Sequence, residues 1–210
     1  MQDLRTLISG FKRFQENYFK SDDALYEELS KGQRPKVLVI GCCDSRVDPA
    51  IITDCRPGDL FVVRNVANLV PPYEPDAHHH GVSAAVEYAV QCLKIEHLIV
   101  LGHSHCGGID VLMREGDNSI NEEFIGRWMS IAQPAKDAIQ RQLSHKPIDI
   151  QRKACEEASI LISLENLLSF PWVARRVETG RLALHGWYFD LEAGQLLGYH
   201  PDTGAFEKLA

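Results

Sequence analysis

The sequence predicts an α/β fold in which helices flank a mostly parallel central β-sheet. Short continuous apolar segments, such as KVLVIG at 36–41 and HLIVLG at 97–102, are typical of strands buried on both faces. Segments with helical periodicity follow these strands. The C-terminal segment instead combines strand patterns with glycine-containing turns, which predicts a β-hairpin extension.

The N-terminal segment is predicted to form a helical arm. Apolar residues recur at helical spacing over residues 2–18, and a second short helix is expected over 22–29. Gly32 and Pro35 follow this segment and would end it, because neither residue continues a helix well.

The rest of the chain is predicted to alternate strands with helices and to end in hairpins. The predicted strands before the hairpins are 37–41, 59–65 and 97–102. A helix is expected after the segment HHHG, with one apolar face formed by Val82, Val86, Ala89 and Leu93. Residues 106–169 are expected to be mostly helical, with breaks near Gly116, Pro134 and Pro147, and with Pro171 ending the region. Residues 181–206 are expected to form a strand followed by turns at 192–194 and 202–204.

Length and composition restrict the possible classes of protein. The 210 residues, 45% of them hydrophobic, predict a single domain over 1–210. A net charge of −7 disfavours a nucleic-acid partner, which would require a basic face. No apolar run approaches the roughly 20 residues of a membrane span, and no signal peptide is recognisable, so a cytoplasmic location is expected. The six cysteines are therefore expected to be reduced thiols or metal ligands.

Two motifs directly follow predicted strands. Cys42 comes after the strand 37–41, and His103 comes after the strand 97–102, with Cys106 three residues later. Because functional groups gather at the carboxyl ends of parallel strands, these three side chains converge if the two strands are neighbours. Two thiolates and an imidazole suit zinc, and three protein ligands leave the fourth position open, as in catalytic sites. The sequence therefore predicts one Zn²⁺ per chain.

Asp44 and Arg46 lie beside the first predicted ligand. A carboxylate next to a zinc-bound water can accept its hydrogen bond and orient the resulting hydroxide, while Arg46 holds that carboxylate off the metal through a paired fork. Two other interpretations stay open. Asp44 could itself ligate zinc in a closed form, or the segment could be a turn with a surface salt bridge of little energetic value.

Together, the motifs CCDSR at 42–46 and HSHCGG at 103–108 resemble those of the β-class carbonic anhydrases, in particular a plant-like subgroup. The resemblance also includes residues 57–73 and 81–90 and covers most of the chain. It implies the reaction CO₂ + H₂O ⇌ HCO₃⁻ + H⁺, with zinc-bound hydroxide as the nucleophile. The residues it assigns are Cys42, His103 and Cys106 as zinc ligands, and Asp44 and Arg46 as the orienting dyad.

The resemblance also implies a substrate pocket and an assembly. The pocket positions are Gln33, Phe61, Val66, Tyr88 and Gly107. Gln33 would donate a hydrogen bond to the substrate oxygen, and Phe61 and Tyr88 would form an apolar wall. The chain is expected to bind CO₂ and bicarbonate and to form a homodimer or a higher homo-oligomer, a tetramer or an octamer. In that assembly the helical arm, residues 1–30, would pack on a partner subunit.

Two properties of the activity can be predicted. A second subgroup of the family has a regulatory bicarbonate pocket built from Trp, Arg and Tyr, and the matching positions here are Val39, Arg64 and Phe189. Since only the arginine remains, we expect no bicarbonate-regulated switch of that kind, and cooperative inhibition by bicarbonate would contradict this. Two thiolates formally cancel the charge of zinc, so activity is expected to rise with pH into the alkaline range.

Other functions stay open at this point. A related hydrolase could act on carbon disulfide or carbonyl sulfide, and a non-catalytic zinc protein could use the same ligands. A thiol redox protein could use the Cys42–Cys43 pair, but this leaves His103 and Arg46 unexplained. The cysteines interpreted as structural thiols or oxidation-sensitive positions are Cys43, Cys55, Cys92 and Cys155. The candidate proton relays, on residue type alone, are His78, His79, His80 and His105.

Overall fold

The structure is a computed structural model that describes residues 4–19, 25–76, 78–114 and 123–210. The chain divides into two compact units, residues 1–34 and 35–210. The predictions of one domain over 1–210 and of an arm that packs on a partner stay predictions. Each unit is described by itself below.

The first unit consists of α1 (Leu4–Phe19) and α2 (Leu25–Leu29), as the periodicity predicted. Residues 22–24 of the second predicted helix lie outside the described residues. Aromatic rings join the two helices: Tyr26 of α2 lies 5.5 Å from Phe14 and 4.6 Å from Phe19, measured between ring centroids. The apolar side chains nearer the start of α1 are more than half exposed. These are Leu4, Leu7, Ile8 and Phe11.

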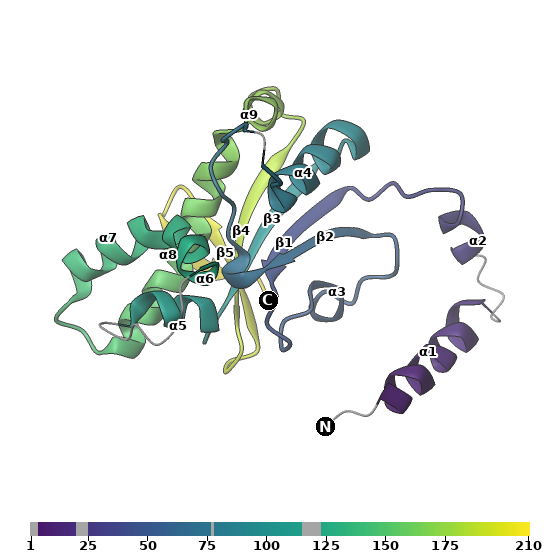
Figure 1. Cartoon of the computed structure of the whole chain (residues 1–210), viewed down its shortest axis with the longest axis horizontal. Coiled ribbons are helices and arrows are strands. Elements are labelled where there is room, and N and C mark those ends of the chain that lie inside the picture. Colours follow the sequence, from purple (N-terminus) through teal and green to yellow (C-terminus); the bar gives the residue numbers. More distant parts are fainter. Residues whose placement is uncertain (1–3, 20–24, 77, 115–122) are drawn as a thin grey trace. The chain divides into compact units, whose positions relative to one another are not determined.

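The second unit is built around a six-stranded sheet in the order β2-β1-β3-β4-β5-β6 (Figure 1). The strands are β1 (Val37–Cys42), β2 (Leu60–Asn65), β3 (His97–His103), β4 (Ala183–Asp190), β5 (Gln195–His200) and β6 (Ala205–Lys208). The first four strands pair in parallel, whereas β4–β5 and β5–β6 are antiparallel. The predicted fold class, a mostly parallel sheet with a C-terminal hairpin extension, is confirmed.

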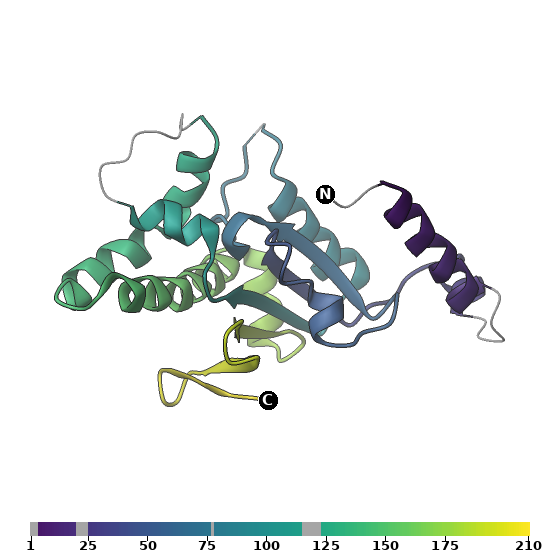
Figure 2. The same cartoon turned by 90° about the horizontal axis from the view of Figure 1, so that it is seen from below.

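One face of the sheet carries the larger core. Leu38 and Ile40 of β1 and Leu98 and Val100 of β3 are fully buried on this face, because alternate residues of a strand point the same way. Four helical segments cover them: α4 (Gly81–Glu87), its continuation η2 (Tyr88–Leu93), α8 (Ile148–Leu168) and α9 (Pro171–Glu178). In both views α8 runs along the sheet, against β3 and β4 (Figures 1 and 2).

The sequence prediction located the longer helices except α9, and it missed two short helical segments. The helical region was expected to end at Pro171, but α9 begins there, because proline is favoured in the first turn of a helix. The expected breaks near Pro134 and Pro147 are present, and Gly116 lies outside the described residues. The other helical segments are α3 (Pro49–Ile52), η1 (Val66–Asn68), α5 (Gly107–Met113), α6 (Ile125–Met129), η3 (Ser130–Ala132) and α7 (Gln133–Leu143). Within the described residues, no helix combines the length and apolarity that crossing a membrane would need.

Candidate metal site

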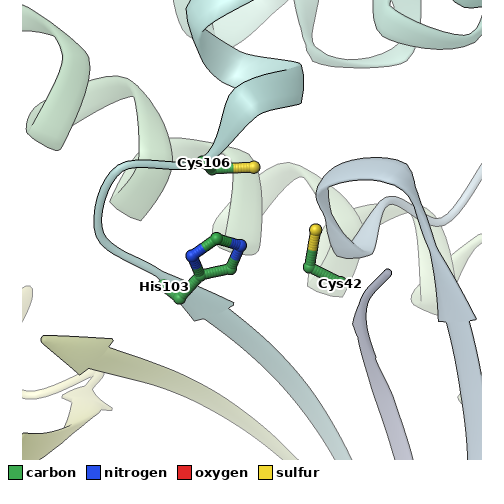
Figure 3. Close-up of side chains that lie close together, drawn as sticks. All are labelled: Cys42, His103 and Cys106. Atoms are coloured by element: carbon green, nitrogen blue, oxygen red, sulfur yellow. The ribbon is translucent and has the colours of Figure 1, made fainter. Parts of the chain in front are cut away.

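Cys42, His103 and Cys106 meet at the carboxyl end of the sheet. Cys42 ends β1 and His103 ends β3, and these strands are parallel neighbours. Cys106 is the N-cap residue, directly before the first residue of α5. One donor atom of each side chain lies within 4.8 Å of the other two, and all three residues are at least 95% buried. Figure 3 shows both sulfur atoms and the imidazole turned toward a common point.

Cys42 and Cys43 are adjacent in the chain, but their side chains lie in different environments. Cys42 lies on the same face as Ile40 and is buried, whereas Cys43 is exposed. The backbone N–H groups of Asp44 and Ala67 each donate to Cys42 Sγ at 3.4 Å. Hydrogen bonds of this kind favour the thiolate, which is the form of cysteine that binds a metal.

The two ring nitrogens of His103 have different surroundings. Nδ1 lies 2.8 Å from the backbone oxygen of Ser104, and a carbonyl only accepts, so Nδ1 carries the proton in the neutral imidazole. Nε2 is buried and makes no hydrogen bond within the part of the chain that the structure describes. Buried nitrogens are rarely left in this state. An imidazole fixed through Nδ1 with Nε2 free toward two sulfurs is the arrangement of a metal-ligating histidine.

The three donors share a negative charge. A hydrogen bond from Cys106 lowers the pKa of Cys42 to about 4, and the neighbouring His103 acts in the same direction against the effect of burial. The same contact with the Cys42 thiolate, together with burial, raises the pKa of Cys106. Burial alone would lower the pKa of His103, but Cys42 and the Ser104 carbonyl more than offset this and raise it. A divalent cation would compensate this charge, so the donor set fits Zn²⁺.

Asp44 and Arg46 form the expected fork beside this cluster. Arg46 Nε donates to Asp44 Oδ1 at 2.9 Å, and its Nη2 donates to Oδ2 at 2.7 Å. Arg46 also donates from its backbone to Oδ1 and from Nη2 to the backbone oxygen of His105. These contacts hold the pKa of Asp44 well below its usual range. The carboxylate of Asp44 is not one of the clustered donors among the described residues.

Arg64 fixes the backbone of the segment 42–48, which carries the Asp44–Arg46 fork, through hydrogen bonds. Its Nε donates to the backbone oxygen of Cys42 at 2.9 Å, its Nη2 to that of Asp44 at 2.7 Å, and its Nη1 to the carboxylate of Asp48 at 3.0 Å. Asp48 in turn accepts hydrogen bonds from the first N–H groups of α3. No local sequence pattern predicts this role for Arg64.

The residues predicted to line the substrate pocket lie in different places. Phe61 and Tyr88 are in contact, with ring centroids 5.9 Å apart. Val66 lines a cavity of about 680 Å³ together with Cys43 and Trp128. Gly107 lines a second cavity, of about 570 Å³, beside Cys106. Gln33 is exposed and belongs to the first unit, whereas the other four residues belong to the second.

The other positions singled out in the sequence have identifiable surroundings. Val39 is buried and belongs, with Phe189, to an apolar cluster on the second face of the sheet. The absence of a bicarbonate-regulated switch stays a prediction. Two of the candidate relays lie within hydrogen-bond distance of a carboxylate. His105 Nε2 lies 3.0 Å from Glu192 Oε1, and His80 Nε2 lies 2.6 Å from Asp76 Oδ1. Their role in proton transfer also stays a prediction.

Sequence reasoning missed two buried residues: one hydrogen-bonds the backbone of Cys106, and the other hydrogen-bonds the first. Glu156 of α8 is buried and accepts the N–H of Cys106 at 2.9 Å, and Tyr188 of β4 donates to the same carboxylate at 2.8 Å. The available signal was a glutamate next to Cys155 on a helix face that also carries Ser159 and Ile160. A charged side chain in the buried stripe of a helix needs a partner.

Comparisons with known proteins agree with this geometry. Residues 37–196 match the family described as carbonic anhydrase. Beta carbonic anhydrase 3 of Arabidopsis thaliana is 42% identical over 188 residues, which cover 89% of this chain and 72% of that protein. The solved structure of the β-carbonic anhydrase CcaA matches with a TM-score of 0.92 and 37% identity, over 99% of this chain and 92% of that chain. A tetrameric β-carbonic anhydrase of the filamentous ascomycete Sordaria macrospora matches with a TM-score of 0.84 and 25% identity, over 97% of this chain and 98% of that chain.

The fold, the cluster of donors and these matches define an enzyme family. The chain belongs to the carbonic anhydrase family, in its β class. The predicted enzyme class and the resemblance on which it rested are thereby confirmed.

Proposed function

We propose that this protein catalyses the reversible hydration of CO₂ to bicarbonate and a proton, with one zinc ion held by Cys42, His103 and Cys106. The observation that carries the proposal is the meeting of three buried N/S donors within 4.8 Å, beside the Asp44–Arg46 fork. Membership of the carbonic anhydrase family supports the same reaction. When bound, zinc would act as a Lewis acid that acidifies a water molecule and so supplies the nucleophile for CO₂.

The chain's own residues prepare the site for that ion. Cys42 and Cys106 provide the charge that a divalent cation requires, and His103 provides the free Nε2. The N–H groups of Asp44 and Ala67 hold Cys42 Sγ in place. Because only three side chains of the chain would hold the ion, a position would stay open for a water.

Asp44 is the residue that would orient this water. Arg46 occupies one acceptor direction on each carboxylate oxygen, and an ionised carboxylate retains further lone pairs. A remaining lone pair can accept the hydrogen bond of the water and fix the direction of its attack. The same fork keeps Asp44 ionised and directed toward Arg46, which favours the open form of the site over a form in which Asp44 is a ligand.

Five residues are proposed to receive the substrate. Phe61 and Tyr88, already in ring contact, would offer an apolar surface to an apolar gas. Gln33 would donate a hydrogen bond to a substrate oxygen. The remaining two positions are Val66 and Gly107.

We further propose that the active form is a homo-oligomer. The tetrameric state of the Sordaria macrospora relative supports this, as does the exposed apolar surface of α1. A cytoplasmic location belongs to the same proposal and rests on the sequence expectation alone.

The proposal is tested by stopped-flow CO₂ hydration on the zinc-loaded protein, with Asp44→Asn and Asp59→Asn measured in parallel. Asp59 lies in the turn before β2, away from the donor cluster, so its variant should match the wild type. Asp44→Asn should lose activity by a factor on the order of 10² or more, the range that proton-handling groups contribute. It should retain zinc, because Asp44 is not one of the clustered donors. The wild-type rate should rise with pH into the alkaline range.

Two results would contradict the proposal. An absence of CO₂ hydration by fully zinc-loaded wild type would reject it, and hydrolysis of carbon disulfide or carbonyl sulfide would then separate the related hydrolase from a non-catalytic zinc protein. Full activity in Asp44→Asn would reject the orienting role of the dyad while leaving the reaction in place.

A further inference from the structure

A carboxylate lies where the packing of α8 would favour an apolar side chain. Glu156 is only 5% exposed, and it lies on the same helix face as the buried residues Ser159, Ile160 and Ser163. Burial raises its pKa, which reflects the cost of placing a charge there. Replacing a buried charged group by an apolar one is often neutral or stabilising. Stability of the core alone therefore does not account for Glu156.

The two carboxylate oxygens of Glu156 have separate partners. Oε1 accepts the backbone N–H of Cys106 at 2.9 Å. Oε2 accepts the hydroxyl of Tyr188 at 2.8 Å, and Tyr188 is fully buried in β4. Glu156 therefore joins the start of α5 to the middle of the sheet, and Tyr188 fixes its orientation.

The segment that Glu156 holds carries two of the three clustered donors. Between His103 and Cys106 the chain turns sharply, with His105 in the left-handed region at φ 57°. Ser104 is tied to β4 and to the turn after it: its N–H donates to Phe189, and its hydroxyl accepts from Leu191. At Cys106 the corresponding anchor is Glu156.

We propose that Glu156 is a positioning residue of the metal site: its carboxylate, oriented by Tyr188, holds the Cys106 backbone so that Cys106 Sγ faces Cys42 and His103. The inference rests on the proposed zinc site. It assigns Glu156 and Tyr188 to metal affinity and ligand geometry, and neither side chain takes part in the reaction itself. Partners of this kind change metal affinity by about 10–100-fold when they are removed.

Four variants separate positioning from stability. Glu156→Ala removes both hydrogen bonds, and Tyr188→Phe removes only the one that orients the carboxylate. Glu156→Gln keeps an oxygen acceptor for Cys106 and has an amide that can donate to Tyr188. Ser159→Ala is the matched control: its buried hydroxyl lies one turn along α8 and donates to the backbone oxygen of Glu156 at 2.7 Å, so its removal leaves both carboxylate hydrogen bonds of Glu156 in place.

The readouts are the zinc dissociation constant, from competition with a chelator, and the absorption spectrum of the Co²⁺-substituted protein, which reports tetrahedral thiolate coordination. We expect Glu156→Ala to bind zinc about 10–100-fold more weakly and to alter the cobalt spectrum. Tyr188→Phe should change the zinc dissociation constant and the cobalt spectrum in the same direction as Glu156→Ala, but to a smaller extent. Glu156→Gln and Ser159→Ala should remain close to the wild type.

The inference is overturned if Glu156→Ala binds zinc as tightly as Ser159→Ala and gives a wild-type cobalt spectrum. If Glu156→Ala does not fold, the test rests on Tyr188→Phe. A wild-type zinc affinity and a wild-type cobalt spectrum in Tyr188→Phe would then overturn the inference. A wild-type protein that binds no zinc would instead reject the proposed metal site, and the inference with it. Tight zinc binding by the wild type with unaffected variants would reject the inference alone.

Discussion

At the scale of the residue, the two thiols differ in protonation because they share one charge. Cys42, with its pKa lowered to about 4 by the hydrogen bond from Cys106, is a thiolate at neutral pH. Cys106, with its pKa raised by that thiolate and by burial, keeps its proton. A metal ligand must be deprotonated, so Cys106 has a proton to lose when zinc binds near neutral pH. The pKa of His103 is also raised, so its imidazole gives up a second proton wherever it is charged.

This difference predicts how zinc affinity depends on pH. Because binding releases the proton of Cys106, the apparent affinity should fall about tenfold for each unit that the pH is lowered through neutrality. Further into acid the fall should steepen, since the pKa of His103 is also raised and its imidazole must lose a proton as well. Chelator competition at several pH values measures the slope.

Cys43→Ser is the control for this measurement, because Cys43 is exposed and lies outside the donor cluster. Its slope should match that of the wild type. An affinity that does not vary with pH would contradict the prediction, and a slope of two protons near neutrality would mean that a second donor, His103 or Cys42, is protonated as well.

At the scale of the element, the start of α5 packs closely on η1. A Cβ added at Gly108 would lie 2.7 Å from Val66 Cγ1 and 3.0 Å from Ala67 Cβ. Ala67 is itself in the left-handed region, at φ 62°, and its N–H donates to Cys42 Sγ. Glycine at 108 thus allows α5, which carries Cys106, to approach the segment that supports Cys42.

Gly108→Ala should therefore lower the free energy of unfolding. Overpacking costs about 1–3 kcal/mol, whereas the helix propensity gained by replacing glycine with alanine is at most about 1 kcal/mol. Gly107→Ala is the matched control, because nothing lies within 4 Å of a Cβ at that position. Urea denaturation measures both variants. Equal free energies of unfolding for the two variants would contradict the prediction, because η1 would then have moved to make room for the added methyl group without loss of stability.

At the scale of the whole molecule, we expect the exposed apolar surface of α1 to take part in association between chains. Leu7 and Phe11 are 54% and 57% exposed, and Leu4 and Ile8 extend the same apolar surface. A monomer rarely leaves such a continuous apolar helix face in water. That residues 1–30 pack on a partner subunit stays a prediction.

The double variant Leu7→Glu, Phe11→Glu should accordingly form a smaller species than the wild type. Two charges on the apolar face would have to be buried in the assembly, which is unfavourable. Sedimentation velocity of the zinc-loaded protein gives the mass of each species. Glu16→Lys changes a charge on the opposite face of α1 and should leave the mass unchanged. A wild type that sediments as a monomer would count against the homo-oligomer, and an unchanged mass in the double variant against the arm's part in it.

The fold could be predicted largely because its elements have distinct periodicities. Continuous apolar segments identified β1 and β3, and helical spacing identified α1 and α4. The helix α9 was missed because Pro171 is compatible with both the end of one helix and the start of the next. The short α3 and η1 were missed because segments of three or four residues have no readable period.

The sequence by itself determined which side chains could form the donor set, because Cys42 and His103 end segments whose continuous apolar residues indicate buried strands, and Cys106 follows three residues after His103. Only the tertiary structure decided that β1 lies beside β3, which brings Cys42 within reach of residues some sixty positions away. It also decided that Glu156 reaches the backbone of Cys106 and that Arg64 pins the Asp44 segment. Such contacts join residues far apart in the chain, and no local pattern encodes them, because they depend on the order of strands in the sheet and on which face of a helix meets it.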